Sequence, residues 1–165
     1  MATTFVIPQN RAIVTRDGNQ KPLAATYLEL MRAHERLHGE FAALFRRVDL
    51  SDASYNVLRI LRGAHPGGLA CGTIADRMVT RVPDITRLVD RLERMGWVVR
   101  ERGQVDRRVV YVKISPAGLE LLNSLDAPVR DLHQSQLGHL GERDLKQLRR
   151  LLRALSERGA DSAGS

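Results

Sequence analysis

The side chains best suited to recognition chemistry lie in the stretch VTRVPDITRLVDRLERMGW, residues 79 to 97. Apolar residues recur there at three- and four-residue steps, the spacing of one buried helix face, at Ile85, Leu88, Val89, Leu92 and Met95. The remaining arc carries polar residues, namely Asp84, Thr86, Arg87, Asp90, Arg91 and Arg94. An arginine fork of N–H donors suits phosphate oxygens and guanine edges. The alternative for the same pattern is an ordinary solvated helix face.

The opening of this stretch is unusual, because it places an acid at the start of a surface helix in a chain of formal net charge +7. Pro83 suits the first helical position, and Asp84 in the first turn is stabilised by the positive end of the helix dipole. We therefore expect the helix to begin at Pro83. If the helix meets DNA, Asp84 either accepts a hydrogen bond from a cytosine amino group or excludes wrong sites. Otherwise Asp84 only marks the helix start.

A second basic cluster follows the helix, in residues with the two-residue alternation of strands. It contains five cations, Arg100, Arg102, Arg107, Arg108 and Lys113, against the two acids Glu101 and Asp106. An arginine at the tip of such a hairpin can enter a narrow minor groove, where negative potential is concentrated. A charged turn that keeps a short hairpin soluble is the alternative.

Other reactive residues do not assemble into a catalytic or metal centre in the sequence. His34 and His38 lie one helical turn apart, but no second cluster accompanies them. The single Cys71 allows no internal disulfide or cysteine metal cage, and plain packing or partial exposure is favoured over redox sensing, which needs a stabilised, accessible thiolate. Serines lack a matching histidine and acid, and there is no glycine-rich phosphate loop. We expect no enzyme activity, no metal and no cofactor.

Composition bounds the class of protein. The 165 residues fit one domain with appended helices, and 26 Lys and Arg against 19 Asp and Glu favour a polyanionic partner. Genomic base composition is the alternative source of the arginines. One cysteine, no apolar leader and no run of about 18 apolar residues predict a cytoplasmic protein without membrane contact.

The elements that must position these side chains can be placed from periodicity. We expect a flexible N-terminal arm over 1–22, a long helix over 23–50, a central lobe over 51–115, further helices over 116–158 and a disordered tail over 159–165. Within the lobe, short helices at 72–79 and from Pro83 form a helix-turn-helix candidate. Strands at 97–102 and 108–114 form a hairpin, and Pro128 should kink or divide the helix that follows.

The predicted fold class is thus mainly α with a small β-hairpin wing, a winged helix-turn-helix lobe. The helices from both chain ends are too apolar to stand alone, so we expect them to pair in a homodimer. In helix-turn-helix docking the N-terminal residues of the second helix lie nearest the bases, which favours Thr86 and Arg87 as base-contacting residues. Asp90 and Glu93 are expected to pair with Arg91 and Arg94 at helical spacing.

Two blocks, DITRLVDRLERMGWV and DRRVVYVKISPAG, resemble the multiple antibiotic resistance regulator (MarR) family of winged helix-turn-helix regulators. The resemblance spans roughly residues 23 to 155. It implies a homodimer whose recognition helices enter successive major grooves of a pseudo-palindromic operator while the wings reach the flanking minor grooves. It also implies a repressor released by a small phenolic or anionic ligand that binds between the dimerisation helices and the lobe.

The resemblance and the residue pattern together give the candidate sites. Recognition-helix contacts are expected from Arg81, Pro83, Asp84, Thr86, Arg87 and Arg91. Wing contacts are expected from Arg102, Asp106, Arg107 and Arg108, and by resemblance Arg108 is the wing arginine that Asp106 holds. A candidate ligand crevice involves Tyr27, Met31, His34, Tyr55 and Leu58, for which ordinary core or dimer contacts are the alternative. A winged-helix protein-interaction module without specific DNA binding is the second functional hypothesis.

Overall fold

In the computed structural model, which describes residues 21–103 and 108–161, the chain forms two units that are described separately, Met1–Gly39 and Glu40–Ser165. The long helix α1 (Lys21–Arg46) supplies the described part of the first unit and begins the second. It starts two residues before the predicted position. The second unit holds the central lobe and the C-terminal helices.

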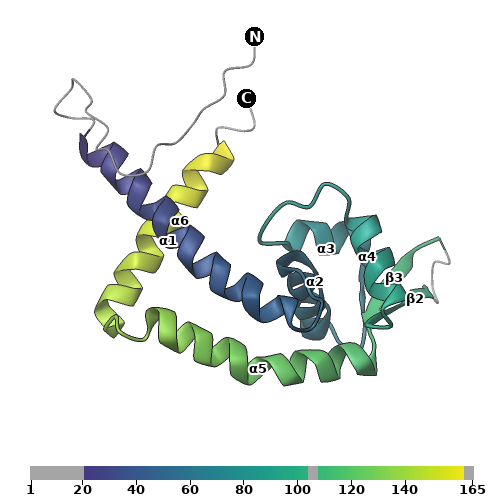
Figure 1. Cartoon of the computed structure of the whole chain (residues 1–165). Coiled ribbons are helices and arrows are strands. Elements are labelled where there is room, and N and C mark those ends of the chain that lie inside the picture. Colours follow the sequence, from purple (N-terminus) through teal and green to yellow (C-terminus); the bar gives the residue numbers. More distant parts are fainter. Residues whose placement is uncertain (1–20, 104–107, 162–165) are drawn as a thin grey trace, which may run out of the picture. The chain divides into compact units, whose positions relative to one another are not determined.

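Three short helices build the helical part of the lobe: α2 (Asp52–Gly63), α3 (Cys71–Arg77) and α4 (Ile85–Arg94). Figure 1 shows them lying together beside the strands. Ser51 caps α2, since its Oγ accepts the Ser54 N–H at 3.1 Å. Helix α3 is shorter than expected, and it buries Ile74 while Ala75 is exposed.

The wing is an antiparallel sheet of three strands in the order β1-β3-β2. Strands β2 (Val98–Arg102) and β3 (Val110–Ile114) form the predicted hairpin, with Val98 opposite Ile114 and Arg102 opposite Val110. The third strand, β1 (Leu69–Ala70), was not predicted, because two residues are too short to show an alternating pattern.

Helix α5 (Pro116–Leu137) leaves the sheet and α6 (Glu142–Asp161) follows it. Ser115 caps α5, and its hydroxyl also donates to the Gly96 carbonyl at 2.6 Å. Pro128 was expected to kink or divide this region, and division is excluded because α5 continues as one helix through it. Helix α6 runs three residues beyond its predicted end near Arg158.

The core of the second unit lies where α2, α3, α4, α5 and the sheet meet. Its fully buried side chains are Val57, Leu58, Leu61, Ile74, Val89, Leu92, Val98, Val112 and Leu122. Burying each large aliphatic side chain contributes roughly 1.5–3 kcal/mol relative to leaving it exposed. A mainly helical chain with a small antiparallel sheet around this core confirms the predicted winged-helix fold class.

Candidate nucleic-acid interface

The turn between α3 and α4 is held against α2 by a side chain that sequence reasoning missed. Asn56 on α2 accepts the Val79 N–H through its Oδ1 at 3.0 Å. Beyond it, Thr80 and Arg81 are exposed. In the sequence, Asn56 stands out only as a polar residue between Tyr55 and Val57. The sequence does not reveal that its side chain meets the backbone of the distant Val79.

Helix α4 has the two faces that its sequence predicts. Val89 and Leu92 are fully buried, and Ile85 and Leu88 are partly buried against the core. On the opposite arc Thr86, Arg87, Arg91 and Arg94 are exposed. The helix therefore anchors itself by its apolar side and presents a hydroxyl and arginines to solvent.

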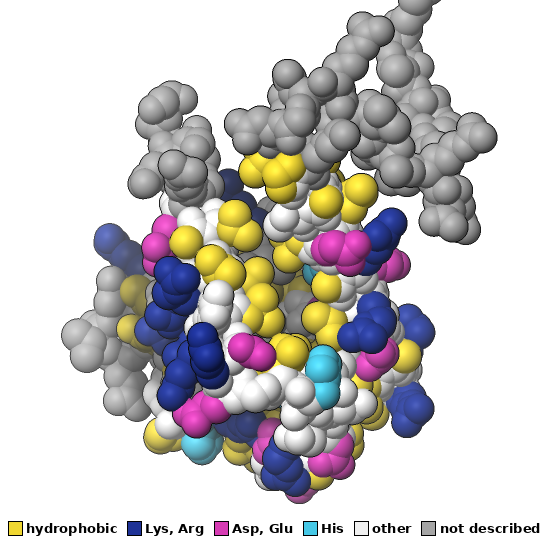
Figure 2. Space-filling view, turned by 90° about the vertical axis from the view of Figure 1, so that its left-hand side faces the viewer, with side chains coloured by type: hydrophobic (Ala, Val, Ile, Leu, Met, Phe, Trp, Pro, Cys, Tyr) yellow, Lys and Arg dark blue, Asp and Glu magenta, His cyan; other side chains and the backbone are white. Residues whose placement is uncertain are grey.

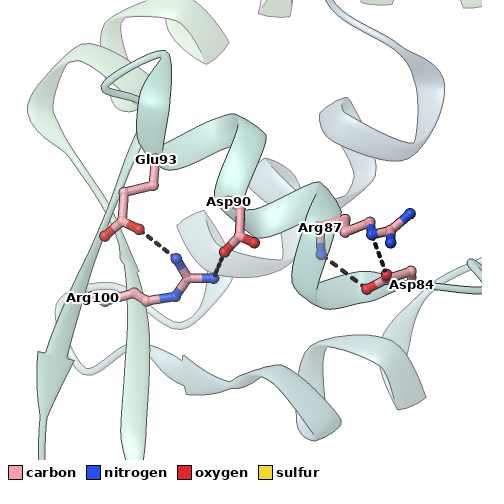
Figure 3. A network of polar contacts seen from close by, with 5 residues as sticks. All are labelled: Asp84, Arg87, Asp90, Glu93 and Arg100. Carbon is pink, nitrogen blue, oxygen red and sulfur yellow. Dashed lines mark hydrogen bonds and ion pairs between the residues drawn. The ribbon is translucent and has the colours of Figure 1, made fainter.

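The start of α4 lies two residues later than predicted. Asp84 is the N-cap, with φ −139°, and Pro83 precedes it outside the helix. The Asp84 carboxylate accepts the Arg87 N–H through Oδ1 at 3.0 Å, which satisfies one of the free donors of the first turn. Its Oδ2 forms an ion pair with Arg87 Nε at 3.0 Å (Figure 3).

Arg91, on the next exposed turn, reaches an acid from a different segment. Its Nη2 lies 3.5 Å from Asp49 Oδ1, in the loop that joins α1 to α2. Asp49 has a positive φ of 53°, in the left-handed region that aspartate tolerates better than most residues. The loop before α2 thereby contacts the outer side of α4.

Arg100 on β2 contacts the inner acids of α4. Its guanidinium donates through Nη2 to Asp90 and through Nη1 to Glu93 (Figure 3). Burial opposes the charged form of Arg100, but the hydrogen bonds that it donates to Asp90 and Glu93 outweigh burial and raise its pKa. The predicted pairing of these two acids with Arg91 and Arg94 was wrong, because the folded hairpin brings Arg100 closer than any neighbour on the helix itself.

The hairpin positions its other cations differently. Lys113 on β3 pairs with Glu101 on β2, with Nζ 2.6 Å from Oε2. Arg102 and Arg108 are exposed near the end of the hairpin. The predicted contacts Asp106 and Arg107 lie outside the described residues.

A bidentate ion pair joins the lobe to α5. Arg62 Nη1 and Nη2 donate to Asp126 Oδ2 and Oδ1 at 2.8 and 2.9 Å. The hydrogen bond from Arg62 is the main reason that the pKa of Asp126 is lowered. This pair joins residues 64 positions apart in the sequence, and sequence reasoning did not find it.

The candidate ligand residues fall into both units. Tyr27, Met31 and His34 are exposed on the first part of α1, and the His34 ring stacks on His38 with centroids 5.5 Å apart. In the second unit Tyr55 is partly buried and stacks on Phe45, whereas Leu58 is fully buried in the core. Leu58 therefore has no surface to offer a ligand in this structure.

A hollow of about 350 Å³ lies elsewhere, between the last turns of α1 and α5. Its lining mixes apolar and charged residues: Glu40, Ala43, Leu44, Arg47, Pro128, Asp131, Leu132 and Ser135. In the part of the chain that the structure describes, no three His, Cys, Asp or Glu side chains gather to bind a metal. Nor does any helix there have the length and apolar character needed to cross a membrane.

Comparison with known proteins places this arrangement in a family. Residues 50–110, which span the lobe, match the MarR family model. A MarR transcription factor from Planctomyces limnophilus is 45% identical, with a TM-score of 0.63 over 79% of this chain and 95% of that one. The transcriptional repressor IacR of Pseudomonas putida is 28% identical over 74% of this chain and 72% of its own length.

A third relative, BpsR of Bordetella bronchiseptica, shares the fold at 24% identity. Its TM-score is 0.68 over 77% of this chain and 89% of that one, and its structure concerns regulation of DNA binding by 6-hydroxynicotinic acid. The Planctomyces protein is matched over 95% of its length, and an identity of 45% indicates common descent as well as a shared fold. The chain therefore belongs to the MarR family of transcriptional regulators.

Proposed function

We propose that this chain is a homodimeric, sequence-specific DNA-binding repressor whose α4 helices enter successive major grooves of a pseudo-palindromic operator. The observation that carries the proposal is the division of α4, which buries Val89 and Leu92 and leaves Thr86, Arg87 and Arg91 exposed. Arg81, Pro83 and Asp84 lie at the same end of the helix. The exposed wing arginines Arg102 and Arg108 are proposed to reach the flanking minor groove, together with Asp106 and Arg107.

Exposed apolar faces on the outer helices support a dimer. Helix α6 presents four leucines with exposed fractions of 38–60%: Leu148, Leu151, Leu152 and Leu155. The first part of α1 presents Leu23, Tyr27, Leu30 and Met31. Figure 2 shows a face on which hydrophobic side chains lie open to solvent with cationic side chains beside them. Leucines repeated along a helix are costly to leave in water, and a second copy of the chain would cover them.

Release by a small aromatic acid is the regulatory part of the proposal. The regulation of BpsR by 6-hydroxynicotinic acid supports this ligand class for a chain of the same fold. Tyr27, Met31, His34 and Tyr55 are the proposed contacts, whereas Leu58, which is fully buried in the core, would not touch the ligand. A thermal-shift screen of hydroxylated aromatic acids tests this part, and uniform failure to shift the melting temperature would contradict it. As a DNA-binding repressor the protein would act in the cytoplasm.

A gel-shift titration tests the DNA-binding part. The probe is the DNA upstream of the chain's own gene, with a shuffled sequence of equal length as competitor. We expect Arg87→Ala to lower operator affinity by about 5- to 150-fold, the value of one bidentate arginine–base contact of ~1–3 kcal/mol. Arg143→Ala, which removes an exposed arginine of α6, should change affinity little. Equal binding of both DNAs, unaffected by Arg87→Ala, would favour the protein-interaction module instead.

A further inference from the structure

We propose that Asp84 is a positioning residue for Arg87, holding its guanidinium by Nε so that the two Nη groups face outward as a fork for one guanine. The inference rests on the proposed DNA-binding function and deepens it. It concerns specificity, because it assigns the preferred base at one operator position to a pair of residues rather than to one arginine.

Both oxygens of the Asp84 carboxylate are directed at the same residue. Oδ1 accepts the Arg87 backbone N–H at 3.0 Å, and Oδ2 pairs with Arg87 Nε at 3.0 Å. The side chain of Arg87 is therefore tied at its Nε to the group that caps its own helix. Figure 3 shows the two contacts of Asp84, one with the backbone nitrogen of Arg87 and one with its Nε.

Other arginines around α4 are held in the opposite way. Arg100 uses both Nη groups on Asp90 and Glu93, and Arg91 uses Nη2 on Asp49. In those residues the end of the fork is already engaged. Arg87 meets Asp84 through Nε, and a bidentate contact with guanine O6 and N7 needs two N–H donors along one edge. The edge that remains free is the one formed by Nη1 and Nη2.

The pair contributes little to folding, since the side chains of Arg87 and Asp84 are 87% and 47% exposed and exposed ion pairs are weak. Its effect is on binding. A free arginine loses rotamer freedom when it contacts a base, and holding it in place beforehand reduces that loss. This accounts for an acid facing DNA in a basic chain. The repulsion between Asp84 and the DNA phosphates is offset because Arg87 is already ordered for its contact with the base.

A double-mutant cycle tests the inference. Affinity is measured for the operator and for the same operator with one guanine changed to adenine, namely the guanine that wild-type protein protects from methylation. The proteins compared are wild type, Asp84→Asn, Arg87→Ala and the double variant. Asparagine keeps an oxygen that caps the helix but removes the carboxylate. We expect Asp84→Asn to lose several-fold of the guanine preference, to keep the wild-type melting temperature and to bind shuffled DNA more tightly. In the Arg87→Ala background it should cause no further loss of preference.

The control is Asp76→Asn, which removes an exposed acid from α3 and should leave the guanine preference unchanged. An equal loss of preference from Asp84→Asn with and without Arg87 would show that Asp84 reads a base itself and would overturn the inference. An unchanged preference in Asp84→Asn would also overturn it. Wild-type protein that binds operator and shuffled DNA equally would instead refute the proposed function on which the inference rests.

Discussion

Arg100 of the wing donates a hydrogen bond to Asp90 of α4, which joins the hairpin to the middle of the proposed recognition helix. Glu93, one turn further along α4, accepts from the same guanidinium. The side chain of Arg100 is 24% exposed, so solvent competes with these bonds less than it does at the helix surface. The two elements proposed to contact DNA therefore keep a fixed relation to each other before binding.

Replacing Arg100 with methionine should destabilise the lobe. The change leaves two carboxylates without their cation, and hydrogen bonds to charged groups contribute about 1.5–3 kcal/mol. Because the side chains of Asp90 and Glu93 are 49% and 39% exposed, we expect a smaller loss, about 1–2 kcal/mol in the free energy of unfolding by urea. Arg102→Met, on the same strand, should cost much less, since Arg102 is exposed. Equal losses in both variants would show that Arg100 does not join the two elements.

The pair of Arg62 and Asp126 predicts a dependence of stability on pH. The pKa of Asp126 is lowered in the folded protein, so its ion pair stabilises the fold fully above the unfolded-state pKa, about 3.9. This stabilisation is lost as pH falls through the folded-state pKa. Asp126→Asn should therefore be less stable than wild type at pH 7, and the difference should shrink in acid. With Asp126 45% exposed, the difference at pH 7 should be at most about 1 kcal/mol.

Urea unfolding at stepped pH from 7 to 3 measures this difference. Glu29→Gln is the control, because its carboxylate pairs with Arg32 at an exposed position, 72% accessible. A difference between wild type and Asp126→Asn that stays constant down to pH 3 would contradict the assignment.

Leu155→Glu should weaken the proposed dimer. Leu155 is 60% exposed on α6 in the single chain, and a carboxylate placed in an apolar interface would be buried without a partner. We expect sedimentation equilibrium to show dissociation at protein concentrations where wild type is dimeric, with a matching loss of operator affinity. Arg143→Glu, on α6 away from the leucines, should remain dimeric. A Leu155→Glu variant as dimeric as wild type would place the interface elsewhere.

Gly118 in α5 should not accept a side chain. A Cβ built there would lie 2.3 Å from the Trp97 carbonyl oxygen and 2.9 Å from Ile114 Cγ1, so backbone has to move. Overpacking of this kind costs about 1–3 kcal/mol, which Gly118→Ala should show in urea unfolding. Gly72→Ala in α3 meets nothing within 4 Å and should be neutral or stabilising. A Gly118→Ala protein as stable as wild type would mean that α5 can shift away from Trp97.

The features predictable from sequence were those encoded by local periodicity. The apolar face of α4, the caps at Ser51 and Ser115 and the hairpin between Val98 and Ile114 each depend on residues a few positions apart. The fold class followed from their order along the chain. The exposed arc with Thr86 and Arg87 followed from the same periodicity, once the buried face was known.

The features that sequence reasoning missed depend on contacts between distant segments. Arg100 was assigned to the wing surface, yet in the folded lobe its side chain contacts Asp90. Asp49 and Asp126 likewise received no role, because their partners Arg91 and Arg62 lie far along the chain. The start of α4 was misplaced because Pro83 and Asp84 both fit a first turn, and only the hydrogen bond from the Arg87 N–H to Asp84 identifies the cap.

Methylation-protection footprinting on the DNA upstream of the chain's own gene tests the central claim most directly. It reports access to guanine N7 in the major groove, the atom that an arginine fork would contact. The proposed dimer predicts two protected guanines related by a dyad and about one helical turn, ~34–36 Å, apart, with protection lost in Arg87→Ala. Protection that is absent, or uniform along unrelated DNA, would contradict sequence-specific recognition by α4.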